Sequence, residues 1–319
     1  MIRTLALLTA LLMQPPAWAE QFNFGVFGDL PYNDAERAEL PGLLAAMAAA
    51  EVAFAVHVGD MKSSNTPCDD ITLSDFRDTL SNTPFPTVFV PGDNEWLDCD
   101  RRSSGGFKPE ERLDKLRSLF HAAPQSLGTK PFPLVRQGDA DFTHGAYMEH
   151  LRWHRGPVTF FTLNIPGSDN NFGALREAGA EFRHRMSAVR DWISGSFAEA
   201  RKRKSGAVVL FMHANPDFEA FAAGSPARGY AELLNALRAE LSDFEGQVLV
   251  IHGDTHVMRI DHPLRDFSGV TIERFRRAEV FGSPIPGWIE VFVNTEAQQL
   301  IRIAPRPLRS EDLTNAPLD

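Results

Sequence analysis

Residues 52–60 read VAFAVHVGD, a run of apolar and β-branched side chains that ends in a Gly-Asp pair. Two other stretches follow the same plan, FNFGVFGD at 22–29 and TVFVPGD at 87–93. Short apolar runs of this kind are typical of buried strands. Because segments rich in Ala and Leu lie between them, at about 35–50 and 73–80, the pattern predicts strand–helix–strand units with parallel strands.

The rest of the chain continues this alternation. Further helices are expected at about 110–121, 175–204 and 230–241, and further strands at about 143–153, 158–164, 207–212, 247–252, 257–260, 270–275, 288–294 and 299–303. Few helices separate the last strands, so we expect the second half to end in antiparallel hairpins. The sequence therefore predicts an α/β protein with two sheets and one domain over residues 20–305, followed by a polar tail over 306–319.

The N-terminus has the plan of a secretory signal peptide. Met1-Ile2-Arg3 is a basic start, residues 4–13 are apolar, and Ala17-Trp18-Ala19 is a small-x-small cleavage site. The apolar run is too short for a membrane span, which takes roughly 20 residues, although an anchoring helix is the alternative. We expect cleavage after Ala19, a periplasmic or secreted protein, and no membrane span in the mature chain.

Charge and cysteine content narrow the possible functions. The chain carries 32 Lys and Arg against 42 Asp and Glu, a net charge of −10. Such a surface repels nucleic-acid backbones, so nucleic-acid binding is not expected. The chain has two cysteines, Cys68 and Cys99. In an oxidising compartment an even count favours a disulfide between them, with two separate thiols as the alternative.

Acids and histidines stand where the predicted strands end. These residues are Asp29, Asp60, Asp93, His213, Asp254 and His256. The carboxyl ends of neighbouring parallel strands meet at one crevice, where several carboxylates repel one another unless a cation joins them. We therefore expect a metal there, with the glycines before the acids allowing backbone and ion to approach closely. On extended backbone, Asp254 and His256 would share one face.

Five steps along the chain resemble the motifs of the calcineurin-like metallophosphoesterases, which are Asp-x-His, Gly-Asp, Gly-Asn-His-Glu/Asp, a lone His and Gly-His-x-His. The corresponding steps here are Gly28-Asp29-Leu30-Pro31, Gly59-Asp60, Gly92-Asp93-Asn94-Glu95, His213 and Gly253-Asp254-Thr255-His256. The resemblance extends over about residues 22–303. It implies a four-layered α/β sandwich of two mixed sheets flanked by helices, with a two-metal centre above the sheets.

The resemblance also implies a role for each of these side chains, with one bridging carboxylate and separate ligands for two divalent ions. The roles are Asp60 as the bridge, Asp29 and His256 on the first ion, and Asp93, His213 and Asp254 on the second. Such a centre activates a hydroxide for in-line attack on phosphorus. The implied activity is hydrolysis of phosphate mono- or diesters.

The sequence departs from the family pattern at the ligand positions. Pro31 replaces one imidazole, unless Tyr32, another segment or water takes over that role. Asp93 stands in place of Asn and Asp254 in place of His, and a one-residue shift that makes Asn94 the ligand is an alternative. The ligand set is thus rich in anionic oxygen, which favours Mn, Mg or Ca over Fe or Zn.

Asn94 stands where the motif has the histidine that usually protonates the leaving group, and an amide cannot donate a proton at neutral pH. Three readings follow: a good leaving group, a substitute acid such as His252 or Glu95, or a site that binds without turnover. We expect an enzyme that acts on a small or surface-attached phosphate ester. The alternative is a catalytically degenerate protein of the same fold that binds a ligand or partner. Asn170 and Asn171 could contact the phosphate group.

Overall fold

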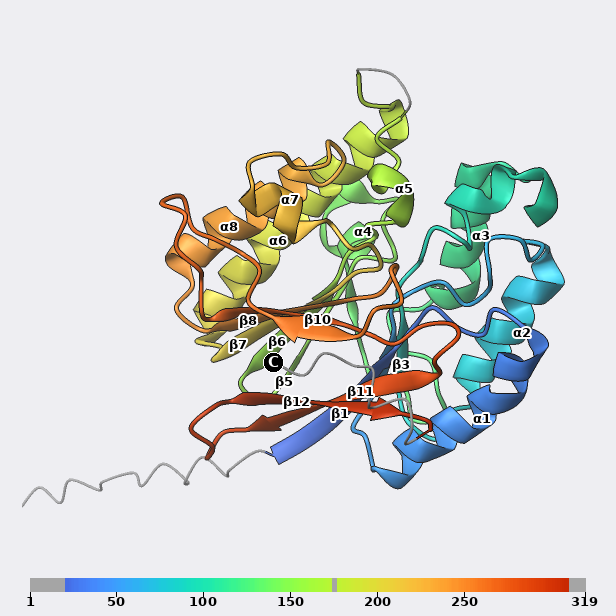
Figure 1. The fold of residues 1–319 in the computed structure, drawn as a ribbon, viewed down its shortest axis with the longest axis horizontal. Helices are drawn as coiled ribbons and strands as arrows, with labels where there is room; N and C mark the ends of the chain where they lie inside the picture. Colours follow the sequence, from blue (N-terminus) through green and yellow to red (C-terminus); the bar gives the residue numbers. More distant parts are fainter. Residues whose placement is uncertain (1–20, 174–176, 310–319) are drawn as a thin grey trace, which may run out of the picture.

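A computed structural model describes residues 21–173 and 177–309 of the chain. Two β-sheets lie face to face, and helices cover the outer face of each, which gives four layers (Figure 1). The expected α/β sandwich is therefore confirmed. The predicted signal peptide, residues 1–19, lies outside the described residues, as does the predicted tail beyond Arg309. Within the described ranges, no helix is long and apolar enough to cross a membrane.

The first sheet has five strands in the order β12-β11-β1-β2-β3. Their bounds are β1 (Gln21–Phe27), β2 (Ala55–His57), β3 (Thr87–Phe89), β11 (Gly287–Asn294) and β12 (Ile301–Pro307). β1, β2 and β3 are parallel neighbours, as the repeated pattern predicts, whereas β11 pairs antiparallel with β1. β12 includes Arg306 and Pro307, which pair with Trp288 and Gly287, so the strand continues into the segment expected as a tail.

The second sheet has seven strands in the order β4-β5-β6-β7-β8-β10-β9. Their bounds are β4 (Val135–Arg136), β5 (Leu151–Arg155), β6 (Val158–Thr162), β7 (Ala207–Phe211), β8 (Gln247–His252), β9 (Arg259–Asp261) and β10 (Phe275–Glu279). The strand expected at 270–275 is displaced, since β10 begins at Phe275. The sequence favours the apolar stretch at 270–275, because a charged residue such as Arg277 argues against a buried strand. In the structure Arg277 is nevertheless buried in β10, where it pairs with Asp261 and Glu219.

Helices from the two halves of the chain cover different sheets (Figure 1). The first sheet is covered by α1 (Asp34–Ala49), α2 (Asp70–Ser81) and α3 (Pro109–Phe120), and the second by α6 (Ala180–Arg203) and α8 (Ala231–Asp243). The short helical segments are η1 (Leu97–Asp100), η2 (Arg102–Ser104), α4 (Gln137–Ala140), η3 (Phe142–His144), α5 (Gly167–Asn170) and α7 (Phe218–Ala222). The irregular strand expected at 143–153 is thus confined to β5, because a polar turn at η3 precedes it.

Local signals explain where the main helices begin. The side chains of Asn33 and Asp69 accept hydrogen bonds from the first turns of α1 and α2. Pro109 occupies the first turn of α3, where its missing N–H is not needed. Three apolar clusters then fill the spaces between the layers, and the one between the sheets includes Phe24 and Phe211. This packing brings the carboxyl ends of β1–β3, β7 and β8 to one edge of the sandwich.

Candidate metal centre

Glycine allows the ends of neighbouring strands to approach one another. Gly59 has φ +97°, and a Cβ placed on it would lie 2.7 Å from the His213 ring. A Cβ on Gly92 would lie 2.2 Å from the Asp60 carboxylate. The glycines before the acids therefore leave room for neighbouring strand ends and their side chains. The sequence predicts that glycine lets the backbone approach an ion. In this structure glycine lets neighbouring protein atoms approach one another.

Left-handed backbone occurs at three of the acids and at one histidine. Asp29, Asp60, Asp254 and His256 all have left-handed φ values, between 54° and 83°. Such values are uncommon outside glycine and cluster at functional sites. The expectation that Asp254 and His256 share one face of an extended chain is therefore wrong. Their loop turns instead, and the Asp254 backbone N–H donates to Asp29 Oδ1 at 3.0 Å.

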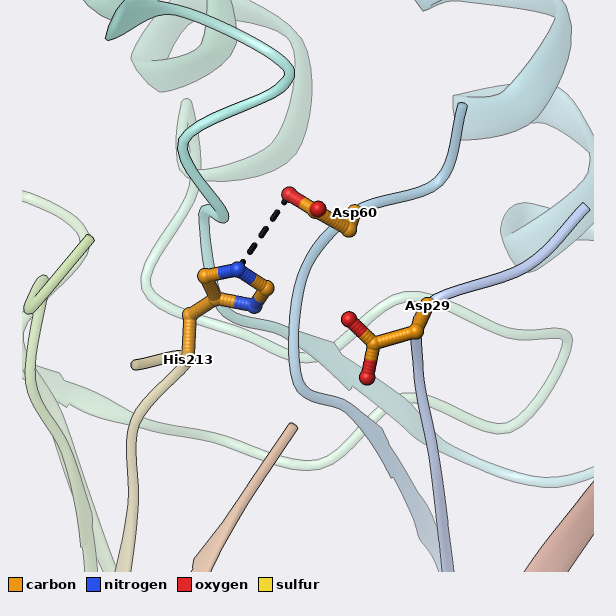
Figure 2. Close-up of side chains that lie close together, drawn as sticks. All are labelled: Asp29, Asp60 and His213. Atoms are coloured by element: carbon orange, nitrogen blue, oxygen red, sulfur yellow. Dashed lines mark ion pairs between the residues drawn. The ribbon is translucent and has the colours of Figure 1, made fainter. Parts of the chain in front are cut away.

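One group of possible ligands consists of Asp29, Asp60 and His213 (Figure 2). Each contributes a ligand atom, and these atoms lie within 4.8 Å of one another. His213 Nε2 is 3.3 Å from Asp60 Oδ1. All three side chains are buried at the strand ends. The acids of β1 and β2 therefore converge as the sequence predicts, and an imidazole from the other sheet joins them.

A second group consists of Asp93, His213 and Asp254, again with ligand atoms within 4.8 Å of one another. His213 Nε2 is 3.0 Å from Asp93 Oδ1 and 4.0 Å from Asp254 Oδ1. Because His213 belongs to both groups, they form one continuous centre. His256 belongs to neither group. Its Nε2 lies 3.7 Å from Asp29 Oδ1, at the edge of the centre.

Both imidazoles are oriented with Nε2 toward the carboxylates. His213 Nδ1 lies 2.9 Å from the carbonyl oxygen of Val58, and His256 Nδ1 lies 2.7 Å from that of Ser283. A carbonyl at Nδ1 accepts the proton there, so Nε2 is the nitrogen that can bind a metal once it carries no proton. Metal-binding histidines are usually oriented in this way. The donor set therefore fits a divalent metal.

The pKa shifts of these side chains also favour a bound cation. Burial raises the pKa of Asp29 and of Asp60 well above the usual value, more than the nearby His213 lowers it. Burial acts to lower the pKa of His213, but Asp60 and the other carboxylates raise it well above its ordinary range. The cluster thus stabilises positive charge within it, which a divalent ion would supply.

Asp60 is held by neutral donors. Tyr32 Oη donates to its Oδ2 at 2.7 Å, and Asn94 Nδ2 donates to the same oxygen at 2.6 Å. The Tyr32 hydroxyl is also 3.3 Å from His256 Nε2. Tyr32 therefore lies between Asp60 and His256, on the side of the centre where Pro31 offers no ligand. Asn94 therefore contacts Asp60 directly.

The two residues considered as substitute acids are fully buried. The Glu95 carboxylate accepts hydrogen bonds from the backbone N–H groups of Gly92 (2.8 Å), Asp60 (3.2 Å) and Met61. This arrangement makes it a support for the two strand-end loops. Burial lowers the pKa of His252 to about 3, so this imidazole is neutral at physiological pH. These positions do not favour either residue as the proton donor.

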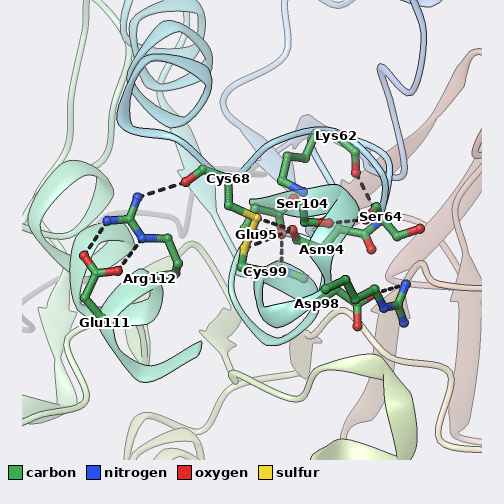
Figure 3. Close-up of a disulfide and its surroundings, with 12 residues drawn as sticks. Lys62, Ser64, Cys68, Asn94, Glu95, Asp98, Cys99, Ser104, Glu111 and Arg112 are labelled. Carbon is green, nitrogen blue, oxygen red and sulfur yellow. Dashed lines mark hydrogen bonds and ion pairs between the residues drawn. A yellow bond between two sulfur atoms is a disulfide. The ribbon is translucent and has the colours of Figure 1, made fainter. Parts of the chain in front are cut away.

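Cys68 and Cys99 form a disulfide, as the even cysteine count predicts. Figure 3 shows that it lies beside the loop carrying Asn94 and Glu95. The sulfur atoms of Cys68 and Cys99 lie 3.5 and 3.6 Å from the Asn94 carbonyl oxygen. The disulfide therefore joins the loops that follow β2 and β3, beside the backbone of Asn94.

The loop after β6 reaches the centre through a residue that the sequence did not single out. Asn170 is buried and donates to the Gly229 carbonyl at 2.7 Å, and Asn171 donates to Glu181 at 2.8 Å. The expected contact of these two amides with phosphate is therefore not what the structure shows. Ser168 instead donates to Asp93 Oδ2 at 3.3 Å. A serine in a loop carries no signal that distinguishes it in the sequence.

Comparisons with known proteins support the resemblance at the level of the fold. No protein-family profile matches the chain, and no curated protein matches it. A dimetal phosphatase from Danio rerio superposes with a TM-score of 0.50 at 14% identity, covering 90% of this chain and 96% of that one. The chain has the metallophosphoesterase fold. A phosphopantetheinyl hydrolase from Mycobacterium tuberculosis also matches, with a TM-score of 0.36, 14% identity, and coverage of 88% and 95%.

Proposed function

We propose that this protein is an exported, metal-dependent hydrolase of phosphate esters. The observation that carries the proposal is the orientation of His213 and His256. Each imidazole is anchored at Nδ1 by a backbone carbonyl and turns Nε2 toward buried carboxylates. The signal-peptide pattern and the disulfide support export. The Danio rerio protein with this fold is named as a dimetal phosphatase, which supports the same reaction class.

Two divalent ions, when bound, supply the Lewis acidity that activates water and neutralises the phosphoryl oxygens. In the proposed arrangement Asp60 joins the two halves of the centre. Asp29 and His256 stand on one side, and the other ligands stand opposite. Those opposite ligands are Asp93, His213 and Asp254. Asn94 and Tyr32 fix the Asp60 carboxylate, and Tyr32 fills the side of the centre where Pro31 has no donor.

The carboxylate-rich ligand set favours Mn, Mg or Ca as the bound ions, since hard cations prefer oxygen ligands. The substrate is a small or surface-attached ester with a good leaving group. Such a leaving group departs without a proton, so the reaction does not need an acid at the position of Asn94. Loss of general-acid help costs roughly 10²–10⁴-fold for poor leaving groups, so nitrophenyl esters should react far faster than alkyl esters.

The test uses the mature protein, stripped of metal and reloaded with Mn, Mg, Ca, Zn or Fe. Elemental analysis should find two equivalents, and nitrophenyl phosphate or its diester should release nitrophenolate until chelator is added. The matched control is Asp60→Asn, which keeps the shape of the side chain but removes the bridging charge. Its turnover should fall by on the order of 10²–10³-fold, because several kcal/mol of charge stabilisation are lost. Failure of every ion to give turnover with either ester would refute the proposal.

A second candidate is a degenerate protein that binds a ligand or partner through the same centre. The observation that favours it concerns Asn94, which stands where the family motif has the proton-donating histidine. Its side-chain amide donates a hydrogen bond to Asp60. The same experiment separates the candidates. Two metal equivalents with no turnover of either ester identify a binding protein, whereas chelator-sensitive turnover identifies an enzyme.

A further inference from the structure

The loop that carries Ser168 has an unusual backbone. Ser168, Asp169, Asn170 and Asn171 have φ values of 53°, 52°, 55° and 54°, so a run of non-glycine residues is left-handed. We call residues 168–171 the left-handed turn. Such a conformation costs roughly 1–2 kcal/mol per residue, and left-handed residues normally occur singly. A run of them persists only where the surrounding structure enforces it.

Arg185, in helix α6, fixes the left-handed turn through hydrogen bonds. Its side chain is fully buried. Nη2 donates to the Asn170 backbone carbonyl at 2.8 Å, and Nη1 donates to both the Asn170 side chain and the Asn164 carbonyl. The remaining N–H groups bond to Glu181. All five guanidinium donors are thus used, a pattern that lysine cannot reproduce.

A second set of contacts, made by residues 229–230, also fixes the turn. The Gly229 backbone N–H donates to Asp169 Oδ1 at 2.8 Å, and the Tyr230 hydroxyl donates to the Pro166 carbonyl at 3.2 Å. The Arg185 guanidinium also lies 5.8 Å from the ring centroid of Trp96, in the loop that follows β3. The turn is therefore fixed both by Arg185 and by residues 229–230, and these buried groups set its position relative to Asp93.

The turn places Ser168 at the exposed edge of the centre. Ser168 is exposed, while its Oγ lies 3.3 Å from Asp93 Oδ2. The preceding Gly167 is so close that a Cβ there would lie 2.9 Å from the Asp93 carboxylate and 3.0 Å from that of Asp254. The Asp254 side chain is 26% exposed, so the centre opens to solvent on this side. A ligand that enters here meets the Ser168 hydroxyl.

We infer that Ser168 contacts the substrate and that its hydroxyl donates a hydrogen bond to a phosphoryl oxygen. This inference rests on the proposed function. In the protein without substrate, the hydroxyl proton is directed to Asp93. A hydroxyl has one proton and rotates freely, so it can turn from the carboxylate to an anionic oxygen beside it. Arg185 is the positioning residue, because it holds the turn that presents Ser168.

The test variant is Ser168→Gly, which removes the hydroxyl and keeps a backbone that tolerates positive φ. The control is Asn171→Gly, which makes the same change at the far end of the turn. Binding of inorganic phosphate to the Mn-loaded protein is measured by calorimetry, together with Mn affinity and thermal stability. Ser168→Gly should weaken phosphate binding roughly 10- to 100-fold, the effect of one lost hydrogen bond to a charged oxygen. Its Mn affinity should equal that of the wild type, and Asn171→Gly should bind phosphate normally.

Arg185→Lys adds a coupling measurement. It should weaken phosphate binding in the wild type and have no further effect in Ser168→Gly, because it acts through the same hydroxyl. A loss of stability without this coupling would show that Arg185 is structural only. Equal phosphate affinity of Ser168→Gly and wild type would overturn the inference while leaving the proposed function intact. Absence of phosphate binding by the Mn-loaded wild type would also overturn the inference, whereas ester turnover alone decides the proposed function.

Discussion

Glu149, Asp29 and Asp60 are all buried, yet the surroundings of Glu149 differ from those of the two aspartates. Glu149 has no exposed surface, and Arg117 donates two hydrogen bonds to it, each of 2.8 Å. Asn164 donates a third at 3.1 Å. Burial alone would raise the pKa of Glu149, but Arg117 lowers it to about 2. This carboxylate has its counter-ion within the chain.

Asp29 and Asp60 have no such arginine among the contacts described above. Their neighbours are other carboxylates, His213 and neutral donors, and burial raises their pKa. The buried Lys62 lies near, but its ammonium donates to the Ser63 carbonyl at 3.2 Å. The chain thus gives Glu149 an arginine partner of its own, whereas the acids of the centre outnumber the imidazole of His213 that lies among them and leave negative charge for a metal to neutralise. This difference is a physical argument for metal that does not depend on the family resemblance.

The largest expected effect is that of metal removal. Two ions, each present at a thousand times its dissociation constant, should raise the free energy of unfolding by about 8 kcal/mol in total. Denaturant unfolding of stripped and Mn-loaded protein measures the difference. Asp60→Asn should abolish most of it, whereas Glu149→Gln should leave it unchanged. An equal loss of metal stabilisation in both variants would remove the contrast between the two kinds of buried acid.

Glu149→Gln should lower the free energy of unfolding by about 3–5 kcal/mol, because it leaves the Arg117 charge without its main partner. The loss should be the same in stripped and Mn-loaded protein. Denaturant unfolding under both conditions gives the measurement. The control is Arg117→Met combined with Glu149→Gln, which should recover part of the loss since no buried charge remains unpaired. A single variant as stable as wild type would mean that Arg117 does not stabilise the buried acid.

The loss of stability caused by Glu149→Gln should depend on pH, which gives a second test of the ion pair between Glu149 and Arg117. The pKa of Glu149 is lowered from its ordinary 4.5 to about 2 in the folded protein. Its contribution is therefore fully present above pH 4.5 and is lost as pH falls toward 2. The difference in unfolding free energy between wild type and Glu149→Gln should be constant from neutral pH to about 4.5 and then shrink. A difference that grows with acid would contradict the assignment.

Much of the fold could be predicted because apolar runs and strand order are local in the sequence. β1, β2 and β3 follow from three similar runs that each end in Gly-Asp, and the parallel order follows from the helices between them. β10 could not be located, since its Arg277 is buried only through partners on β9 and α7. Charge in a strand argues against burial until the partners are known.

The positions of the acids and histidines at the centre could also be predicted, but their contacts could not. The Gly-Asp pairs mark strand ends, and this places Asp29, Asp60 and Asp93 together. The turn at Ser168 depends on Arg185, which belongs to no recognisable motif and reaches the turn only in the folded chain. Likewise, left-handed backbone at Asp254 and His256 replaces the expected extended chain because Asp29 binds the loop.

Asp29→Asn is the smallest and most discriminating change, because the comparison predicts a gain in stability where Glu149→Gln brings a loss. In stripped protein at neutral pH, Asn keeps the size of the side chain and removes a buried carboxyl that Asp254 and Glu279 repel. Removing a carboxyl whose pKa is raised by burial and by neighbouring acids should stabilise the fold by about 1–2 kcal/mol, since one pKa unit corresponds to about 1.4 kcal/mol. The expected gain, read from denaturant unfolding, lies in that range, and Mn should stabilise the variant less than wild type. If Asp29→Asn instead destabilised stripped protein as much as Glu149→Gln does, Asp29 would have a counter-ion within the chain, and the reason for inferring metal from burial would be gone.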